Sequence, residues 1–353
     1  MRLSPGRRSG LRPGSWRGSR SRLGPLGLLS VLGALLLGGC AQHPLSTLNP
    51  AGPVARMELG LMGEGLWIMV GVFAVVATLI LIVLFRFMQR PGEPHSTPPQ
   101  IEGDNRLELL WTIVPIIILA TLLIPTIRTT YVLGAEQPGG LQVDVVGHQF
   151  WWEFDYPQLG IATADGMHIP VGRKVNIHLT SADVIHSFWV PRLAGKQAAI
   201  PGHMGFLWLE ASRAGIYDGE CAEFCGTSHS RMHFRVVAQT PAAFQAWVQQ
   251  MTHPVDTPTT ALAREGQHLF FVTYGCNGCH TIDGTSANGT VGPNLTNFHN
   301  KGMIVADLFA NTPRNVATWL QDPPAIMPGM VMPDFHLSKG QIAALVAYLE
   351  GLH

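Results

Sequence analysis

Two cysteines, a histidine and a methionine lie within the twelve-residue segment CAEFCGTSHSRM, residues 221–232. Cys221 and Cys225 are four positions apart, and His229 and then Met232 follow them. Thiolates and thioethers are soft ligands that select copper, and imidazole also suits copper. A mononuclear blue-copper site uses one cysteine, two histidines and a weak methionine. The second cysteine therefore predicts two coppers that are bridged by two thiolates.

Each copper of such a pair needs its own terminal imidazole. His229 supplies one, and the segment VIHSFWVP offers His186 as the other, at the end of a predicted strand. A disulfide between the two cysteines is an alternative in an exported protein, but it gives the nearby histidine and methionine no role. Zinc held by two cysteines and two histidines is a second alternative, for which the thioether of Met232 has no use.

A second motif, CNGCH, is the attachment pattern of c-type haem. Cys276 and Cys279 would form the two thioether bonds, and His280 would bind the iron. The turn VGPNL follows, and the carbonyl group of Pro293 is placed to orient the histidine ring. A thioredoxin-type redox disulfide would need a preceding strand in a βαβ unit, and the sequence shows no such strand.

The sixth haem ligand is predicted to be a methionine, because His/Met ligation raises the potential for electron transfer. The segment AIMPGMVMPDFHLS offers Met327, Met330 and Met332. This tail resembles the C-terminal part of small class I cytochromes c, in which the ligand precedes a loop and a final helix, and that resemblance favours Met332. The other two would then be packing residues, as methionines usually are. The segment SKGQIAALVAYLEGL has apolar residues at helical spacing, which predicts a final helix after this loop.

The segments that must position these residues read as strands between about 141 and 238. Apolar and polar residues alternate in KVNIHLT (174–180) and in MHFRV (232–236), and turn signals separate such runs. Regularly spaced alternating strands predict a sandwich or barrel. The stretch THPVDTPTTA (252–261) is rich in proline and threonine and reads as a linker to the haem-binding part.

Two long apolar runs, residues 65–85 and 109–127, are predicted to cross a membrane. About 20 apolar residues in a helix span a hydrocarbon core of ~30 Å, and a buried core helix would be shorter or striped. The connecting loop holds Arg86, Arg90 and Arg106. The positive-inside rule places this loop in the cytoplasm and both ends of the hairpin outside.

The N-terminus is basic, free of acids, and leads into a short apolar run, which is typical of a secretory signal. The sequence LGGC resembles a bacterial lipobox, so Cys40 would be the lipidated first residue of the mature chain. The alternative is an uncleaved leader with a free cysteine. All five cysteines then have a role, and none is left for a disulfide. The net charge is zero, so nothing points to nucleic acid.

Residues 58–238 resemble subunit II of cytochrome c oxidase, the family that carries the dinuclear copper centre CuA. The resemblance lies in CAEFCGTSHSRM, in LELLWTIVP of the second apolar run, in GHQFWWEFDY, and in HSFWVPRLAGKQAAIPG. Residues 261–353 resemble small class I cytochromes c. The resemblance implies a two-helix transmembrane hairpin, an all-β cupredoxin-like domain and an all-α class I cytochrome c domain.

The resemblance also implies site residues. The CuA ligands would be His186, Cys221, Glu223, Cys225, His229 and Met232. Glu223 would bind copper through its backbone carbonyl, and its side chain would face a magnesium ion shared with subunit I. Glu108 matches a glutamate at the mouth of a proton path into subunit I. A charged residue at the edge of a span is otherwise an interface anchor.

Two positions depart from the family pattern. The family usually has tryptophan after GHQ, where electrons enter from a docked cytochrome c, and here the residue is Phe150. The family usually has an acid two residues after the lysine of the K…PG segment, and here Ala198 follows Lys196 and Gln197. The first change bears on docking of a donor and the second on contacts with subunit I.

The predicted segments are a lipoprotein-type signal peptide (1–39), an N-terminal segment with the hairpin (40–131, helices at about 65–88 and 109–131), the CuA domain (132–240), a helix end and linker (241–260), and the cytochrome domain (261–353).

The predicted function is that of subunit II of a caa-type oxidase, in which the electron donor is fused to the chain. Haem c would pass electrons to CuA and on to a separate subunit I, which reduces oxygen and pumps protons. The other partners would be further oxidase subunits and an external donor, a cytochrome c or a quinol–cytochrome c reductase. The location would be the bacterial plasma membrane, with both soluble domains outside. One alternative is the corresponding subunit of a CuA-type nitric oxide reductase. A copper carrier for oxidase assembly is another alternative, but a carrier has no need of a haem.

Overall fold

The structure, a computed structural model, describes residues 43–88, 102–253 and 255–353. Residues 43–353 belong to one compact unit. The predicted signal peptide (1–39) and the predicted lipidation at Cys40 lie outside the described residues.

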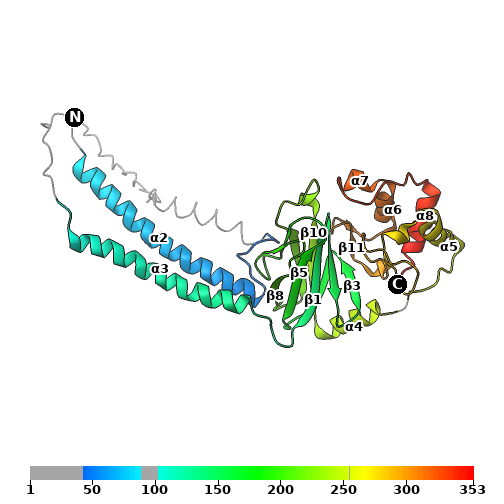
Figure 1. The fold of residues 1–353 in the computed structure, drawn as a ribbon, viewed down its shortest axis with the longest axis horizontal. Helices are drawn as coiled ribbons and strands as arrows, with labels where there is room; N and C mark the ends of the chain where they lie inside the picture. The colour runs from blue at the N-terminus through cyan, green and yellow to red at the C-terminus, as the bar shows by residue number, and fades with distance from the viewer. Residues whose placement is uncertain (1–42, 89–101, 254) are drawn as a thin grey trace, which may run out of the picture. The chain divides into compact units, whose positions relative to one another are not determined.

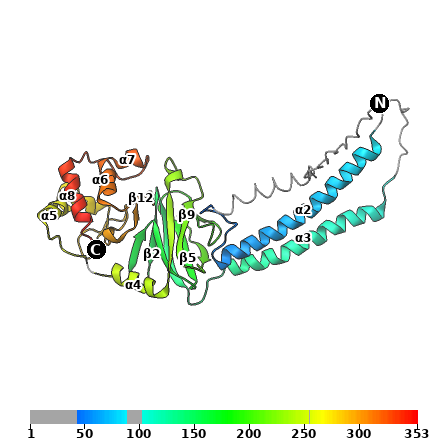
Figure 2. The same cartoon turned by 180° about the vertical axis from the view of Figure 1, so that it is seen from behind.

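Two long helices run side by side: α2 (Pro53–Phe87) and α3 (Asn105–Leu133) (Figure 1; Figure 2). Both are long and apolar enough to cross a membrane. Each extends beyond its apolar run. α3 begins earlier because the side chain of Asp104 caps it and accepts a hydrogen bond from the Arg106 backbone N–H (2.8 Å).

The first turn of α2 packs against the β-sandwich described next. The Ala51 backbone N–H donates to the Arg192 carbonyl (2.7 Å), and Ala51 and Val54 lie in the sandwich core. Gly52 approaches the Glu210 backbone so closely that a Cβ atom there would overlap the carbonyl oxygen. This contact explains why α2 starts well before the apolar run.

Ten strands form two five-stranded sheets, with the orders β3-β2-β1-β5-β8 and β4-β10-β9-β6-β7. Their bounds are β1 Leu141–His148, β2 Trp151–Tyr156, β3 Ile161–Ala164, β4 Gly166–Pro170, β5 Val175–Ser181, β6 His186–Trp189, β7 Gln197–Ala199, β8 Gly205–Leu209, β9 Gly215–Cys221 and β10 His233–Gln239. β1 pairs with β5 in parallel, as β4 does with β10, and the other pairs are antiparallel. The predicted all-β domain is confirmed.

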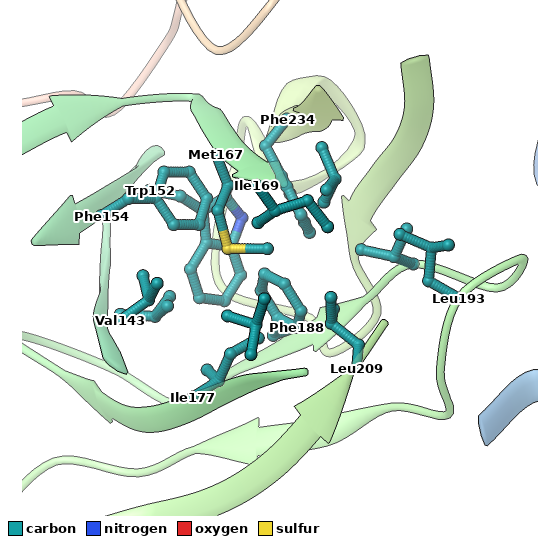
Figure 3. Close-up of a cluster of buried hydrophobic side chains, with 14 of the residues drawn as sticks. Val143, Trp152, Phe154, Met167, Ile169, Ile177, Phe188, Leu193, Leu209 and Phe234 are labelled. Atoms are coloured by element: carbon teal, nitrogen blue, oxygen red, sulfur yellow. The ribbon is translucent and has the colours of Figure 1, made fainter. Parts of the chain in front are cut away.

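Alternating side chains of these strands fill the space between the sheets (Figure 3). Trp152, Phe188 and Phe234 are fully buried. The tryptophan meets both phenylalanines edge-to-face, with ring centroids 5.8 and 5.6 Å away, and the two phenylalanine rings stack on each other at 4.6 Å. Asn176 departs from the predicted alternation because it is buried. Its side chain accepts from the Gln137 backbone N–H (3.0 Å), which satisfies the buried amide.

A C-terminal helical domain follows α4, which packs Phe244 and Trp247 onto the sandwich. The bounds are α4 Pro241–Met251, α5 Ala261–His268, α6 Pro313–Gln321, α7 Pro323–Ile326 and α8 Lys339–Leu349, with a short ribbon of β11 Met303–Ile304 and β12 Phe309–Ala310. Gly266 lets α5 touch α8, because a Cβ there would overlap the Ala344 carbonyl. The predicted final helix is α8, which Ser338 caps.

Candidate metal and haem sites

The first site lies on the loop that joins β9 to β10. Cys221 is the last residue of β9, and His229 begins a short 3₁₀ turn, His229–Arg231. The backbone N–H of Cys221 donates to the Met232 carbonyl (3.0 Å) and closes the loop. The segment that the sequence singled out is therefore folded back on itself, with its sulfur atoms together.

β6 brings in the distant histidine. It pairs with β9 so that Phe188 lies opposite Cys221, and His186 is the first residue of β6. The Nδ1 atom of His186 lies 3.7 Å from the sulfur of Cys221. The sulfur of Cys221 lies 3.8 Å from that of Cys225. These three residues are buried and form a candidate metal-holding group.

The remaining predicted ligands lie on either side of the sulfur pair. The carbonyl oxygen of Glu223 is 3.2 Å from the Cys221 sulfur. The His229 Nδ1 and Met232 Sδ atoms are 3.5 and 3.8 Å from the Cys225 sulfur. Two shared sulfurs with a different imidazole at each end fit two metal ions better than one tetrahedral ion. The softness of the set favours copper.

The contact between the two cysteine sulfurs shifts the pKa of both thiols. The Cys225 thiol, followed by the His186 imidazole, lowers the pKa of Cys221 to about 3 against the effect of burial. The same sulfur–sulfur contact raises the pKa of Cys225. Metal binding requires deprotonated thiols, so a bound cation would stabilise the charges of both sulfurs.

Sequence reasoning missed Asp183. Its carboxylate lies 2.8 Å from Nε2 of His186, the ring nitrogen that faces away from the sulfur. Burial opposes ionisation, but the hydrogen bond with His186 lowers the pKa of Asp183 below its usual value. Carboxylates in this position fix the tautomer and orientation of a metal-binding histidine. The three-residue spacing between Asp183 and His186 was the available signal.

Gln149 was also missed. Its side-chain amide donates to the Cys225 carbonyl (2.6 Å), and its backbone N–H donates to the Asp183 carboxylate (2.6 Å). Gly226 has a φ of 135°, and a Cβ there would press on the Gln149 amide and the Phe150 ring. Gln149 thus contacts the segment that carries Asp183 and His186 and the segment that carries Cys225 and His229. It therefore lies against both sides of the predicted metal site.

The second site is built around the CNGCH motif. Cys276 begins a 3₁₀ turn, Cys276–Gly278, and Cys279 follows it with an exposed thiol. The His280 Nδ1 atom lies 2.8 Å from the Pro293 carbonyl, which is the orientation predicted from the sequence. Burial lowers the pKa of His280, which keeps the imidazole neutral and able to bind iron. The four cysteines in the described ranges are free thiols.

A cavity opens beside this motif. The C-terminal domain lines it with the two thiols, His280 and all three candidate methionines, Met327, Met330 and Met332. Met332 packs against the core of its own domain, whereas Met327 lies in the buried cluster of the sandwich. The donor set of two thiols, an imidazole and a thioether fits haem c. The sandwich contributes Gln149, Phe150 and Trp151 to the same cavity.

The other predicted positions are placed as follows. Glu108 is exposed in the first turn of α3. Glu223 has an exposed side chain, although its carbonyl faces the sulfur pair. Phe150 is 2% exposed. Ala198 lies in β7 opposite Ser187 of β6.

Three family descriptions match the chain. "Cytochrome C oxidase subunit II, transmembrane domain" covers residues 47–129, "Cytochrome C oxidase subunit II, periplasmic domain" covers 159–239, and "Cytochrome c" covers 263–353. The first two matches contain the hairpin and the sulfur loop, and the third contains the CNGCH motif.

Curated relatives match over nearly the whole length. A protein of Alkalihalophilus pseudofirmus named "Cytochrome c oxidase subunit 2" is 37% identical, covering 96% of this chain and 98% of its own. One of the same name from Bacillus sp. (strain PS3) is 38% identical, covering 92% and 97%. A "Quinol oxidase subunit 2" of Bacillus cereus is 34% identical but covers only 68% of this chain and 82% of its own. Of these three relatives, the two that cover more than nine-tenths of this chain are both named "Cytochrome c oxidase subunit 2".

Proposed function

Because the chain belongs to the cytochrome c oxidase subunit II family, we propose that it is the subunit through which electrons enter a haem–copper terminal oxidase. Electrons would reach haem c first, pass to the dinuclear copper CuA, and continue to subunit I, where oxygen is reduced and protons are pumped. The oxygen-reducing site would lie in that other chain.

One observation carries this proposal: Gln149 lines the cavity beside the CNGCH motif and also contacts the loop 221–232 that would hold copper. Phe150 lines the same cavity, and the Gln149 amide donates to the Cys225 carbonyl. When bound, the two coppers and haem c supply one-electron redox chemistry. The chain's own contribution is a scaffold that would hold both groups near one another.

The residues assigned to these groups follow the geometry above. Copper would be held by the Cys221 and Cys225 thiolates, with the other ligands His186, Glu223 (carbonyl), His229 and Met232. Haem c would be held by Cys276 and Cys279 through thioether bonds, and by His280 and Met332 through the iron. The choice of Met332 is supported by its packing against the core of the cytochrome domain.

The replacement at Phe150 also fits an internal donor. Its buried ring faces the haem cavity of the same chain. A tethered donor has a high effective concentration, so a surface adapted to a free donor matters less. An external cytochrome c or a quinol–cytochrome c reductase would then deliver electrons to the fused haem domain.

Three assignments complete the proposal. Glu108, exposed at the start of α3, would lie at the mouth of a proton path in subunit I. The exposed Glu223 side chain would face a magnesium ion shared with that subunit. Lipidation of Cys40 after removal of residues 1–39 would anchor a chain whose two helices span the bacterial plasma membrane, with the soluble domains outside.

A second candidate is the corresponding subunit of a CuA-type nitric oxide reductase, because its copper loop would look the same. Purification of the complex through this chain separates the two. We expect the co-purifying largest subunit to consume oxygen, and rapid-mixing spectra to show haem c reduced before CuA. Consumption of nitric oxide without oxygen reduction would favour the alternative. CuA reduced ahead of haem c would remove the fused domain from the main electron path.

A further inference from the structure

The cytochrome domain shares a buried surface with the sandwich. Ala306 and Met327 belong to the same apolar cluster as the strands of the sandwich, and Val305, Leu308 and Trp319 pack against that cluster. Ala306 and Met327 are each 2% exposed. A transient contact between the two domains would not leave these side chains buried in the core of the sandwich.

A single carboxylate bridges the two domains inside this surface. Asp165 lies between β3 and β4 and is 6% exposed. One of its oxygens accepts from the Trp152 backbone N–H of the sandwich (2.9 Å). The other accepts from the Ala306 backbone N–H of the cytochrome domain (3.0 Å). Both oxygens are thus used as acceptors, one toward each domain.

Charged side chains of both domains lie in this surface. Lys301 of the cytochrome domain donates to the Asn294 carbonyl (2.8 Å) within its own domain. Burial raises the pKa of Asp165 to about 7, and the Trp152 N–H and Lys301 act against that rise. A second pair joins the domains, since Arg235 of β10 lies 2.7 Å from the carboxylate of Asp307. Removing one partner of a buried pair is far more costly than loss of a surface pair.

The backbone around Ala306 has an unusual form. Val305, Ala306 and Asp307 have φ angles of 56°, 49° and 63°. Non-glycine residues rarely adopt this left-handed conformation, and a β-branched residue does so least readily. Such a run persists only when its surroundings hold it. The hydrogen bond of Ala306 with Asp165 and the ion pair of Asp307 with Arg235 are two of the contacts that hold it here.

We propose that Asp165 is an anchor of a fixed docking interface, which seats the cytochrome domain on the sandwich through the Ala306 N–H, with Arg235–Asp307 as a second attachment. Asp165 is a positioning residue: it keeps the haem cavity against Gln149 and Phe150. The internal donor therefore does not swing on the linker between α4 and α5. The role of this seating in electron transfer rests on the proposed function, but the seating itself does not.

Hydrogen exchange of the full-length chain in its purified complex tests the proposal. Asp165 has a φ of 59°, which asparagine also tolerates, so Asp165→Asn keeps the turn. It removes the charge and one acceptor oxygen. We expect the amides of residues 303–310 to exchange roughly 10- to 100-fold faster, as for loss of a buried charged hydrogen bond. Asp144→Asn, a half-exposed acid on β1, is the matched control and should leave them unchanged.

Asp307→Asn is a second variant on the opposite domain, for use if Asp165→Asn disturbs the sandwich fold, which the copper and haem absorption spectra would report. It should also accelerate exchange at 303–310. Rapid exchange of this segment in the wild type, or equal protection in all four proteins, would overturn the proposal. A seated domain that proves not to feed electrons to CuA would instead contradict only the proposed function.

Discussion

The side-chain amide of Gln149 donates to the backbone carbonyl of Cys225 at 2.6 Å. The same glutamine lines the cavity of the haem motif. A single hydrogen bond therefore links Gln149, which lines the cavity, to the backbone of Cys225, a predicted bridging ligand of the metal pair. The two residues are 76 positions apart in the chain, and the fold alone brings them together.

Gln149→Leu should slow electron transfer from haem c to CuA while leaving both groups bound. The substitution keeps the side-chain bulk but removes the amide that fixes the Cys225 carbonyl. Rapid-mixing spectra should show haem c reduced at the normal rate and CuA reduced several-fold later. Gln158→Leu, in an exposed turn of the sandwich, is the control. A normal CuA rate in Gln149→Leu would show that this contact carries no coupling.

Cys221→Ser and Cys225→Ser should each abolish the dinuclear copper without loss of haem c. Both sulfurs lie at the centre of the donor set, whereas haem attachment uses cysteines of the other domain. Copper content per chain and the haem absorption spectrum of the purified variants check this. Two coppers per chain in either variant would refute the assignment of bridging thiolates.

Asp183→Asn should weaken copper binding by about 10- to 100-fold, the usual effect of removing a carboxylate behind a metal-bound histidine. Asp183 holds the outer nitrogen of His186 at 2.8 Å and receives the Gln149 N–H. Competition with a copper chelator measures the affinity. Asp155→Asn, on β2 of the sandwich and away from the sulfur loop, should retain the wild-type value.

Met332→Ala should remove the sulfur-to-iron charge-transfer band of haem c. All three candidate methionines line the cavity, but Met332 packs with the cytochrome core while Met327 and Met330 pack with the sandwich cluster. Met327→Ala and Met330→Ala should keep the band. If either of them loses it, the ligand comes from the surface that faces the sandwich.

Acid should destabilise the sandwich partly through His168. Burial against Trp247, with ring centroids 4.5 Å apart, lowers the pKa of His168 below its ordinary value of 6.5. The unfolded chain then binds a proton more readily than the folded one, so the free energy of unfolding falls as the pH drops below about 6.5. Above that pH, His168 should have no effect on the free energy of unfolding.

Urea midpoints followed by tryptophan fluorescence at pH 8 and pH 5 measure this effect. The midpoint should fall less with acid in His168→Phe than in the wild type, because phenylalanine keeps the stacking but does not titrate. His203→Phe, at an exposed position, should keep the full acid sensitivity. Equal acid sensitivity in all three proteins would exclude His168 as a source.

The sequence by itself determined the features that are encoded locally. The sulfur loop, the CNGCH motif and the final helix each lie within a short segment, so ligand chemistry and helical spacing identify them without knowledge of the fold. The two apolar runs are equally local, because span length depends on composition. The longer extent of α2 was not predictable, since packing of Gly52 on Glu210 sets its start.

Only the tertiary structure decided which distant polar groups meet. The register of β6 and β9 sets His186 beside Cys221. Asp165 and Ala306 are 141 residues apart, and no spacing rule links a turn in a sandwich to a backbone amide in a helical domain. Buried polar groups must find partners wherever the packed chain places them. That requirement acts on the folded surface as a whole, so it becomes visible only once both domains are built.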